Sequence, residues 1–164
     1  MAIQIGDNIP EITLLQKNDE GVHKLQLAET NGKNRVLLFF PGAGTGVCTS
    51  EMCSISDDLN TYQGLDAEVY GISVDSPFAQ YVWAKAHNIT TPLLSDFNKE
   101  AIEAFGAKYD VWLPGINDMN GVAKRSAFVF NKEGKLIHSE ILENAGDLPD
   151  FEKVKDALKQ SSGS

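Results

Sequence analysis

The stretch VLLFFPGAGTGVCTSEMCSI, residues 36–55, runs from a strand-like segment through a glycine-rich turn to both cysteines of the chain. Its first five residues form a continuous apolar run, which is typical of a strand covered on both faces. The residues after the turn predict a helix, because apolar side chains recur there at helical spacing. Those side chains are Cys48, Met52, Ile55 and Leu59. The sequence therefore places Cys48 where a buried strand gives way to a helix.

Strands and helices alternate along the rest of the chain. The predicted elements are a hairpin turning at residues 18–21, strands at 67–74 and 91–96, helices at 75–88 and 97–106, a hairpin over 125–142, and a closing helix over 148–160. Alternation in the middle with a late hairpin predicts an α/β fold of the thioredoxin-like sort. We expect a mixed central sheet flanked by helices, with a β-hairpin at the N-terminus.

Length and composition favour one domain over residues 1–160, with 161–164 as a disordered tail. The hydrophobic fraction of 42% is ordinary, and no apolar run approaches the ~18 residues of a membrane span. A formal charge of −9 without a basic cluster argues against nucleic acid as a partner.

Two cysteines in a reducing compartment favour metal binding or redox chemistry over a permanent disulfide. The first residues, MAIQIGDNIPEITLL, lack a basic segment followed by a long apolar one, so the sequence predicts no secretory signal and a cytoplasmic location. Unpaired amides and the positive dipole end of the predicted helix would favour a thiolate at Cys48. Glycines at 42, 44 and 46 would let the backbone approach a small ligand closely.

A four-residue pattern links this cysteine to a known family. Pro41, Thr45 and Cys48 spell P-x-x-x-T-x-x-C directly after the apolar strand, and Arg125 opens the later segment RSAFVF. Together with GISVDSPF, PLLSDFNKEAIEAFG and VAKRSAFVFNKEGKL, the pattern resembles the peroxiredoxins over essentially the whole chain. The resemblance implies a thiol-dependent peroxidase that reduces hydrogen peroxide and organic hydroperoxides without a metal or other cofactor.

The resemblance also implies a role for each residue. Cys48 is the peroxidatic cysteine, and Thr45 bonds the peroxide through its hydroxyl. Pro41 shields the sulfenic acid, and Arg125 stabilises the thiolate and polarises the O–O bond. Glu51 occupies a position that helps to orient the arginine.

Displacement on a peroxide develops negative charge on the leaving oxygen, so donors must surround both oxygens. The Thr45 hydroxyl, the amides near Val47 and Cys48, and the Arg125 guanidinium are donors of the right kinds. The product is a sulfenic acid on Cys48, which another thiol must capture.

Cys53 is the candidate resolving thiol. Its C-x-x-x-x-C spacing resembles the PrxQ branch, also called bacterioferritin comigratory protein, and implies an intramolecular Cys48–Cys53 disulfide that a thioredoxin-like donor recycles. In an intact helix the two Cα atoms would lie ~8.7 Å apart and the side chains roughly 140° around the axis. A disulfide tolerates only about 7 Å, so we expect the first turns to unwind during the cycle.

Several alternatives stay open. Cys48 can be a small buried hydrophobe, and Cys53 a bystander in a one-cysteine enzyme resolved by an external thiol. The aromatic pairs Tyr81/Trp83 and Tyr109/Trp112 are interpreted as core or subunit contacts, with Trp112 also a candidate for the pocket wall. For the assembly, an edge-to-edge homodimer is favoured over a monomer. The GAGTG loop lacks the aromatic or charged residue that many relatives carry before the threonine, which leaves ligand preference and loop rigidity open.

Three rival functions fit less well. GAGTG matches neither nucleotide-binding glycine pattern, and no lysine follows it. Two thiolates fall short of the four ligands of a structural zinc, so no metal site is predicted. A thiol–disulfide oxidoreductase, which remains an alternative, would normally show C-x-x-C.

Overall fold

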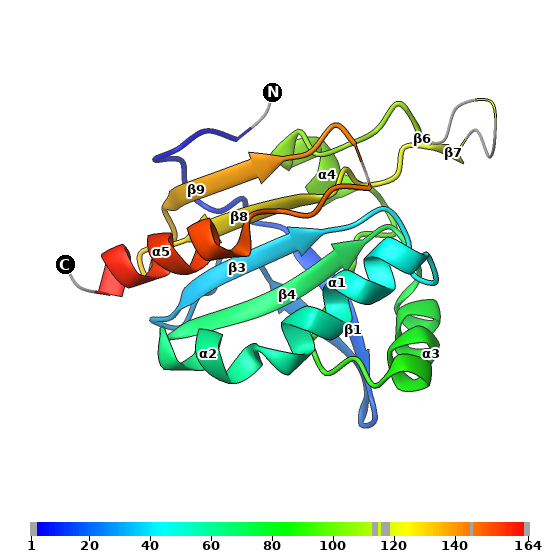
Figure 1. Ribbon diagram of the computed structural model, residues 1–164, viewed down its shortest axis with the longest axis horizontal. Helices are drawn as coiled ribbons and strands as arrows, with labels where there is room; N and C mark the ends of the chain where they lie inside the picture. Colours follow the sequence, from blue (N-terminus) through cyan, green and yellow to red (C-terminus); the bar gives the residue numbers. More distant parts are fainter. Residues whose placement is uncertain (1–2, 113–114, 116–118, 145, 163–164) are drawn as a thin grey trace.

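The computed structural model describes residues 3–112, 115, 119–144 and 146–162 (Figure 1). Its strands are β1 (Thr13–Asn18), β2 (Gly21–Gln26), β3 (Asn34–Phe39), β4 (Ala67–Ser73), β5 (Leu93–Ser95), β6 (Val111–Trp112), β7 (Met119–Asn120), β8 (Ser126–Phe130) and β9 (Leu136–Ile141). Its helices are α1 (Gly46–Asp57), α2 (Leu59–Gly64), α3 (Pro77–His87), α4 (Glu100–Phe105) and α5 (Phe151–Ser162).

In the described residues, seven strands form one sheet in the order β2-β1-β5-β4-β3-β8-β9. The central strands β3, β4 and β5 are parallel to one another, whereas β8 and β9 continue the sheet antiparallel on one side and the β1–β2 hairpin on the other. The predicted mixed sheet with an N-terminal hairpin is therefore confirmed. The small β6–β7 ribbon was not predicted.

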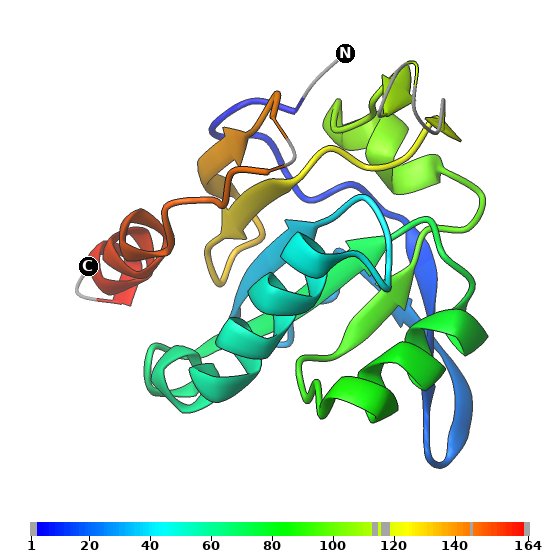
Figure 2. The same cartoon turned by 45° about the vertical axis from the view of Figure 1, so that its right-hand side comes forward.

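The central strand β3 is buried on both faces, as its apolar run predicts. Because side chains alternate along a strand, Leu37 and Phe39 join one cluster of buried residues while Val36 and Leu38 join another. Residues of α4 complete the first cluster, whereas residues of α1, α2, α3 and α5 complete the second. Figure 2 shows α1, in cyan, and α3, in green, on the same side of the sheet.

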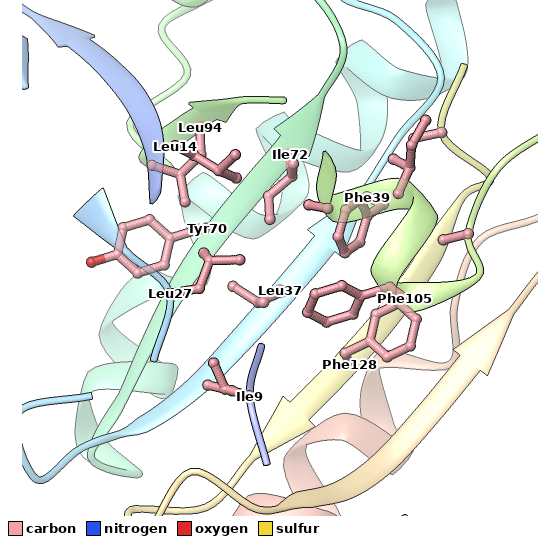
Figure 3. Packing of buried hydrophobic residues seen from close by; sticks show 14 of the residues in the cluster. Ile9, Leu14, Leu27, Leu37, Phe39, Tyr70, Ile72, Leu94, Phe105 and Phe128 are labelled. Atoms are coloured by element: carbon pink, nitrogen blue, oxygen red, sulfur yellow. The ribbon is translucent and has the colours of Figure 1, made fainter. Parts of the chain in front are cut away.

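Aromatic packing marks the first cluster, which Figure 3 shows from close by. The Phe105 ring of α4 lies 5.1 Å from Phe39 and 4.9 Å from Phe128, measured between ring centroids. Such tilted and edge-on arrangements are favourable beyond the apolar area that they bury. This cluster holds the sheet together on the side that does not carry Cys48.

The predicted helix after the glycine turn is shorter than expected. Its first three stripe residues are buried in α1, but the helix ends at Asp57 and Leu59 begins the separate helix α2. The carboxylate of Asp58 accepts a hydrogen bond from Thr61 and pairs with Lys155, which gives the chain an alternative to continuing the helix. Leu59 still packs beside the second cluster, half-buried.

The C-terminal helix α5 continues to Ser162, so the first two residues of the expected 161–164 tail are helical. Residues 163 and 164 lie outside the described part of the chain. None of the helices within the described ranges is long and apolar enough to cross a membrane.

Candidate active site

The site begins where β3 ends. Pro41 is buried, and Gly44 has φ +93°, a backbone angle that favours glycine. Thr45 then caps α1: its hydroxyl oxygen accepts a hydrogen bond from Cys48 N at 3.4 Å, and its hydroxyl donates to Gly42 O at 3.2 Å. The loop therefore delivers Cys48 into the first turn of a capped helix.

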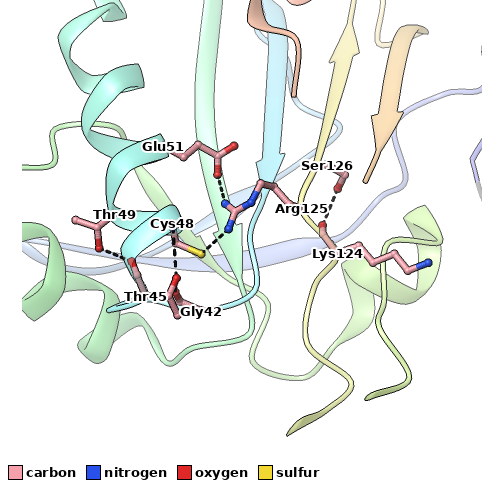
Figure 4. A network of polar contacts seen from close by, with 8 residues as sticks. All are labelled: Gly42, Thr45, Cys48, Thr49, Glu51, Lys124, Arg125 and Ser126. Carbon is pink, nitrogen blue, oxygen red and sulfur yellow. Dashed lines mark hydrogen bonds and ion pairs between the residues drawn. The ribbon is translucent and has the colours of Figure 1, made fainter. Parts of the chain in front are cut away.

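Arg125 joins Cys48 and Glu51 (Figure 4). One guanidinium nitrogen, Nη2, lies 3.1 Å from Cys48 Sγ, and the other, Nη1, lies 2.7 Å from Glu51 Oε1. Cys48 and Glu51 are three residues apart on α1, which places them on one side of the helix. Arg125 precedes β8, whose Ser126 pairs with Phe39, so strand pairing brings the arginine to the end of β3.

These three side chains are almost completely buried. Glu51 is 0% exposed and Arg125 1% exposed. Burial raises the pKa of Glu51 to about 7, although the charge and hydrogen bond of Arg125 oppose the shift. Glu51 Oε2 has no hydrogen-bond partner within the part of the chain that the structure describes. The guanidinium of Arg125 is thus shared between the Cys48 sulfur and the Glu51 carboxyl group.

A cavity of about 710 Å³ opens beside this cluster. Thr45, Val47 and Arg125 line it from the loop, α1 and the start of β8, and Tyr109 and Trp112 line the opposite wall. The Tyr109 hydroxyl lies 3.3 Å from Leu142 O, which anchors that wall. Glu143 and Asn144 also line the cavity, so its wall combines apolar, polar and charged groups beside Arg125.

Cys53 lies apart from this cluster. It is half-buried on α1, and its thiol donates to His87 O at 3.7 Å, at the end of α3. Both cysteines are free thiols in one continuous helix. The structure therefore brings together Pro41, Thr45, Val47, Cys48, Glu51 and Arg125, but leaves Cys53 outside the site.

The positions of two aromatic residues near the site were not predicted. Tyr109 was interpreted only as a core or subunit contact, yet it lines the cavity. Trp83 is a core residue, as interpreted, and in addition its Nε1 donates to Thr49 Oγ1 at 3.0 Å, one residue after Cys48. Trp112, a candidate for the pocket wall, does lie there. Among the described residues, no three His, Cys, Asp or Glu side chains form a group that could hold a metal ion.

Comparisons with known proteins agree with this geometry. A model of the AhpC/TSA family matches residues 5–139. Alkyl hydroperoxide reductase E of Mycobacterium bovis is 32% identical over 160 residues, which cover 95% of this chain and 96% of that protein. A thiol peroxidase of Staphylococcus saprophyticus is 28% identical over 157 residues, covering 96% of this chain and 88% of that one.

Among solved structures, peroxidoxin BcpB of Mycobacterium tuberculosis is similar with a TM-score of 0.76 and 25% identity, covering 96% of this chain and 97% of that one. The chain belongs to the AhpC/TSA family. Within that family it is a peroxiredoxin, so the resemblance, the class of enzyme and the thioredoxin-like fold predicted from the sequence are confirmed.

Proposed function

We propose that this protein reduces hydrogen peroxide and organic hydroperoxides with Cys48 as the attacking thiolate. The observation that carries the proposal is the 3.1 Å contact between Arg125 Nη2 and the buried Cys48 Sγ in the first turn of α1. A cation and the positive end of the α1 dipole both favour the negative sulfur. No metal or organic cofactor enters the mechanism, because the thiolate itself is the nucleophile.

In the first step, the Cys48 sulfur donates an electron pair to one peroxide oxygen and the O–O bond breaks. The leaving oxygen departs as hydroxide or alkoxide and takes a proton to become water or an alcohol. Arg125 and the Thr45 hydroxyl supply donors for the two oxygens. The buried Pro41 at the start of the loop keeps bulk water away from the resulting sulfenic acid.

Cys53 resolves that acid in the second step. Its sulfur attacks the Cys48 sulfur, a disulfide forms, and the hydroxyl group leaves as water. The intact α1 helix, with Cys53 held against His87, supports the need for unwinding before this bond forms. A thioredoxin-like donor then reduces the disulfide by dithiol exchange. Resolution by an external thiol is the alternative, and the half-buried position of Cys53 is compatible with it.

The C-x-x-x-x-C spacing and the likeness to BcpB support the proposal that this peroxiredoxin is of the PrxQ type. The proposed cycle needs Cys48 and Cys53 to return to free thiols, which a reducing compartment favours. The cytoplasm is therefore the proposed location. An edge-to-edge homodimer remains the proposed assembly.

The test is peroxide consumption by the wild type, Cys48→Ser and Cys53→Ser, with dithiothreitol or with a thioredoxin system as reductant. The proposal predicts that Cys48→Ser is inactive with both, and that Cys53→Ser works with dithiothreitol alone. An active Cys48→Ser protein would overturn the assignment of the nucleophile. Equal thioredoxin-dependent rates for Cys53→Ser and wild type would leave resolution to an external thiol.

A further inference from the structure

The loop that precedes Cys48 has almost no side chains to hold it. Residues 42–44 are Gly, Ala and Gly, so packing and side-chain hydrogen bonds can do little to fix their path. Thr45 nevertheless has to be placed accurately, because its hydroxyl belongs to the proposed peroxide site. One backbone hydrogen bond ties the loop to the neighbouring strand end: Ala43 N donates to Asp75 Oδ2 at 2.8 Å.

Asp75 is held in place by its surroundings. It follows β4, and because β4 runs parallel to β3, both strands end at the same edge of the sheet. The Ser73 hydroxyl donates to the same carboxylate oxygen, Oδ2, at 2.7 Å, and the Ser95 hydroxyl donates to Asp75 O at 2.6 Å. Both serines are buried. The carboxylate is therefore fixed through its side chain and its main chain.

A third element extends this network. Gln80 of α3, only 2% exposed, donates through Nε2 to Ser73 Oγ at 2.9 Å and to Leu94 O at 2.8 Å. The chain of hydrogen bonds thus runs from β5 through α3 and β4 to the loop. Gln80 Oε1 has no hydrogen-bond partner in the described residues, so the links from Gln80 to this network run through its Nε2.

We propose that Asp75 is a positioning residue for the peroxide-binding loop, acting through Ala43 N–H to hold Thr45 and the first turn of α1 in the reactive arrangement. The proposal rests on the proposed function of Cys48 and Thr45. A carboxylate suits this task because it only accepts hydrogen bonds, and its charge strengthens the bond to the amide. The bond from Ala43 N to Asp75 would thus hold a loop of glycine and alanine in one conformation.

Asp96 offers a matched control. It follows β5 at the same edge of the sheet and is 1% exposed, but its two carboxylate oxygens accept from Ala101 N and Ile102 N at the start of α4. Removing either aspartate leaves backbone donors without their acceptor. Only Asp75 is bonded to the loop through Ala43 N.

The experiment compares Asp75→Ala, Asp75→Asn, Asp96→Ala and wild type by single-turnover oxidation of Cys48 with hydrogen peroxide. Alkylation of Cys48 by iodoacetamide at the same pH is measured in parallel, because alkylation needs the thiolate but no donors for two oxygens. We expect Asp75→Ala to slow peroxide oxidation by about 10- to 100-fold, with alkylation changed less than about threefold. Asp75→Asn keeps an acceptor oxygen and should restore much of the rate. Asp96→Ala should lower the midpoint of urea unfolding while folded protein keeps the wild-type peroxide rate.

Equal peroxide rates for Asp75→Ala and wild type would overturn the proposal. A parallel fall in peroxide oxidation and alkylation would do the same, because it would show a general loss of the thiol site. If Asp75→Ala does not fold, Asp75→Leu takes its place, because leucine is close to aspartate in size and has no acceptor for Ala43 N; a wild-type peroxide rate in that variant contradicts the proposal. A wild-type Cys48 that does not react with peroxide would instead refute the proposed function, so the two failures are distinct.

Discussion

The guanidinium of Arg125 lies between two buried groups that can each carry a negative charge. Its two terminal nitrogens point to Cys48 Sγ and to Glu51 Oε1, so neither group has the cation to itself. Two anions and one cation in a buried site carry a net negative charge, which costs free energy.

Replacing Arg125 tests the role of this shared charge. Arg125→Ala should slow peroxide oxidation of Cys48 by about 100- to 1,000-fold, the range found when one preorganised donor is lost. Arg125→Lys should recover only part of the rate, because an ammonium group cannot present two parallel donors as a guanidinium does. Stopped-flow oxidation by hydrogen peroxide measures both. A lysine variant as fast as wild type would show that charge alone, without the fork geometry, is sufficient.

Glu51 gives stability a dependence on pH. Its pKa is about 7 in the folded protein and 4.5 for the free side chain, so folding favours the protonated form. The stability that comes from this difference is present below about pH 4.5 and is lost as pH rises through about 7. Glu51→Gln has no such proton to lose, so its free energy of unfolding should fall less than that of wild type between pH 5 and 8. Urea unfolding at both pH values measures the difference, and parallel curves would contradict it.

At the scale of single elements, α1 has a different hydrogen bond near each end. Near its start, Trp83 Nε1 donates to Thr49 Oγ1 at 3.0 Å. Near its end, the Ser56 hydroxyl oxygen accepts from Thr90 N and Thr91 N at 2.9 and 3.0 Å. In the proposed cycle, the unwinding that brings Cys53 to Cys48 breaks the first contact and can leave the second intact. We therefore expect Trp83 to stabilise the helical form of α1, in which the proposed reaction with peroxide takes place.

Trp83→Phe removes this donor and keeps an aromatic ring beside Phe40. Loss of one hydrogen bond, worth about 1 kcal/mol, should speed formation of the Cys48–Cys53 disulfide about fivefold and reduce overoxidation to sulfinic acid at high peroxide. Mass spectrometry of quenched samples measures both products.

Tyr62→Phe is the control for this prediction. Tyr62 packs in the same cluster, and its hydroxyl has no hydrogen-bond partner in the described residues. Its removal should leave the rate of disulfide formation unchanged. An equal effect of the two substitutions would mean that loosened packing, not the Thr49 contact, controls unwinding.

At the scale of the whole molecule, the sheet has an aromatic cluster on one face and the candidate active site on the other. The cluster around Phe39 and Phe105 lies on one face of β3, while Cys48 packs in the cluster on the other face. Phe105→Ala should therefore cost about 3–5 kcal/mol of unfolding free energy. Folded Phe105→Ala protein should keep the wild-type rate of Cys48 oxidation. Urea unfolding and single-turnover oxidation together check this, and a rate that falls with stability would show that the two faces are coupled.

The sequence predicts most of the elements from local pattern, and it predicts the residues of the site from the resemblance to the peroxiredoxins. The run before Pro41, the glycine turn and the P-x-x-x-T-x-x-C spacing are contiguous, and strand pairing brings Arg125 to them. The break at Asp58 depends on Lys155 from a distant helix, and the Ala43–Asp75 bond joins segments 32 residues apart. Such contacts leave no periodic signal in one sequence, which is why neither the end of α1 at Asp57 nor the bond from Ala43 to Asp75 was predicted.

The most direct test of the account is mass spectrometry of the reduced protein after one equivalent of hydrogen peroxide, compared across wild type, Cys48→Ser and Cys53→Ser. The account predicts that the mass of the wild-type protein falls by two hydrogens, because a disulfide forms between Cys48 and Cys53. Cys53→Ser should be trapped as the Cys48 sulfenic acid, and Cys48→Ser should not react. An unreactive Cys48 in the wild type would contradict the central claim that this buried thiol, held beside Arg125, is the peroxide-reducing group.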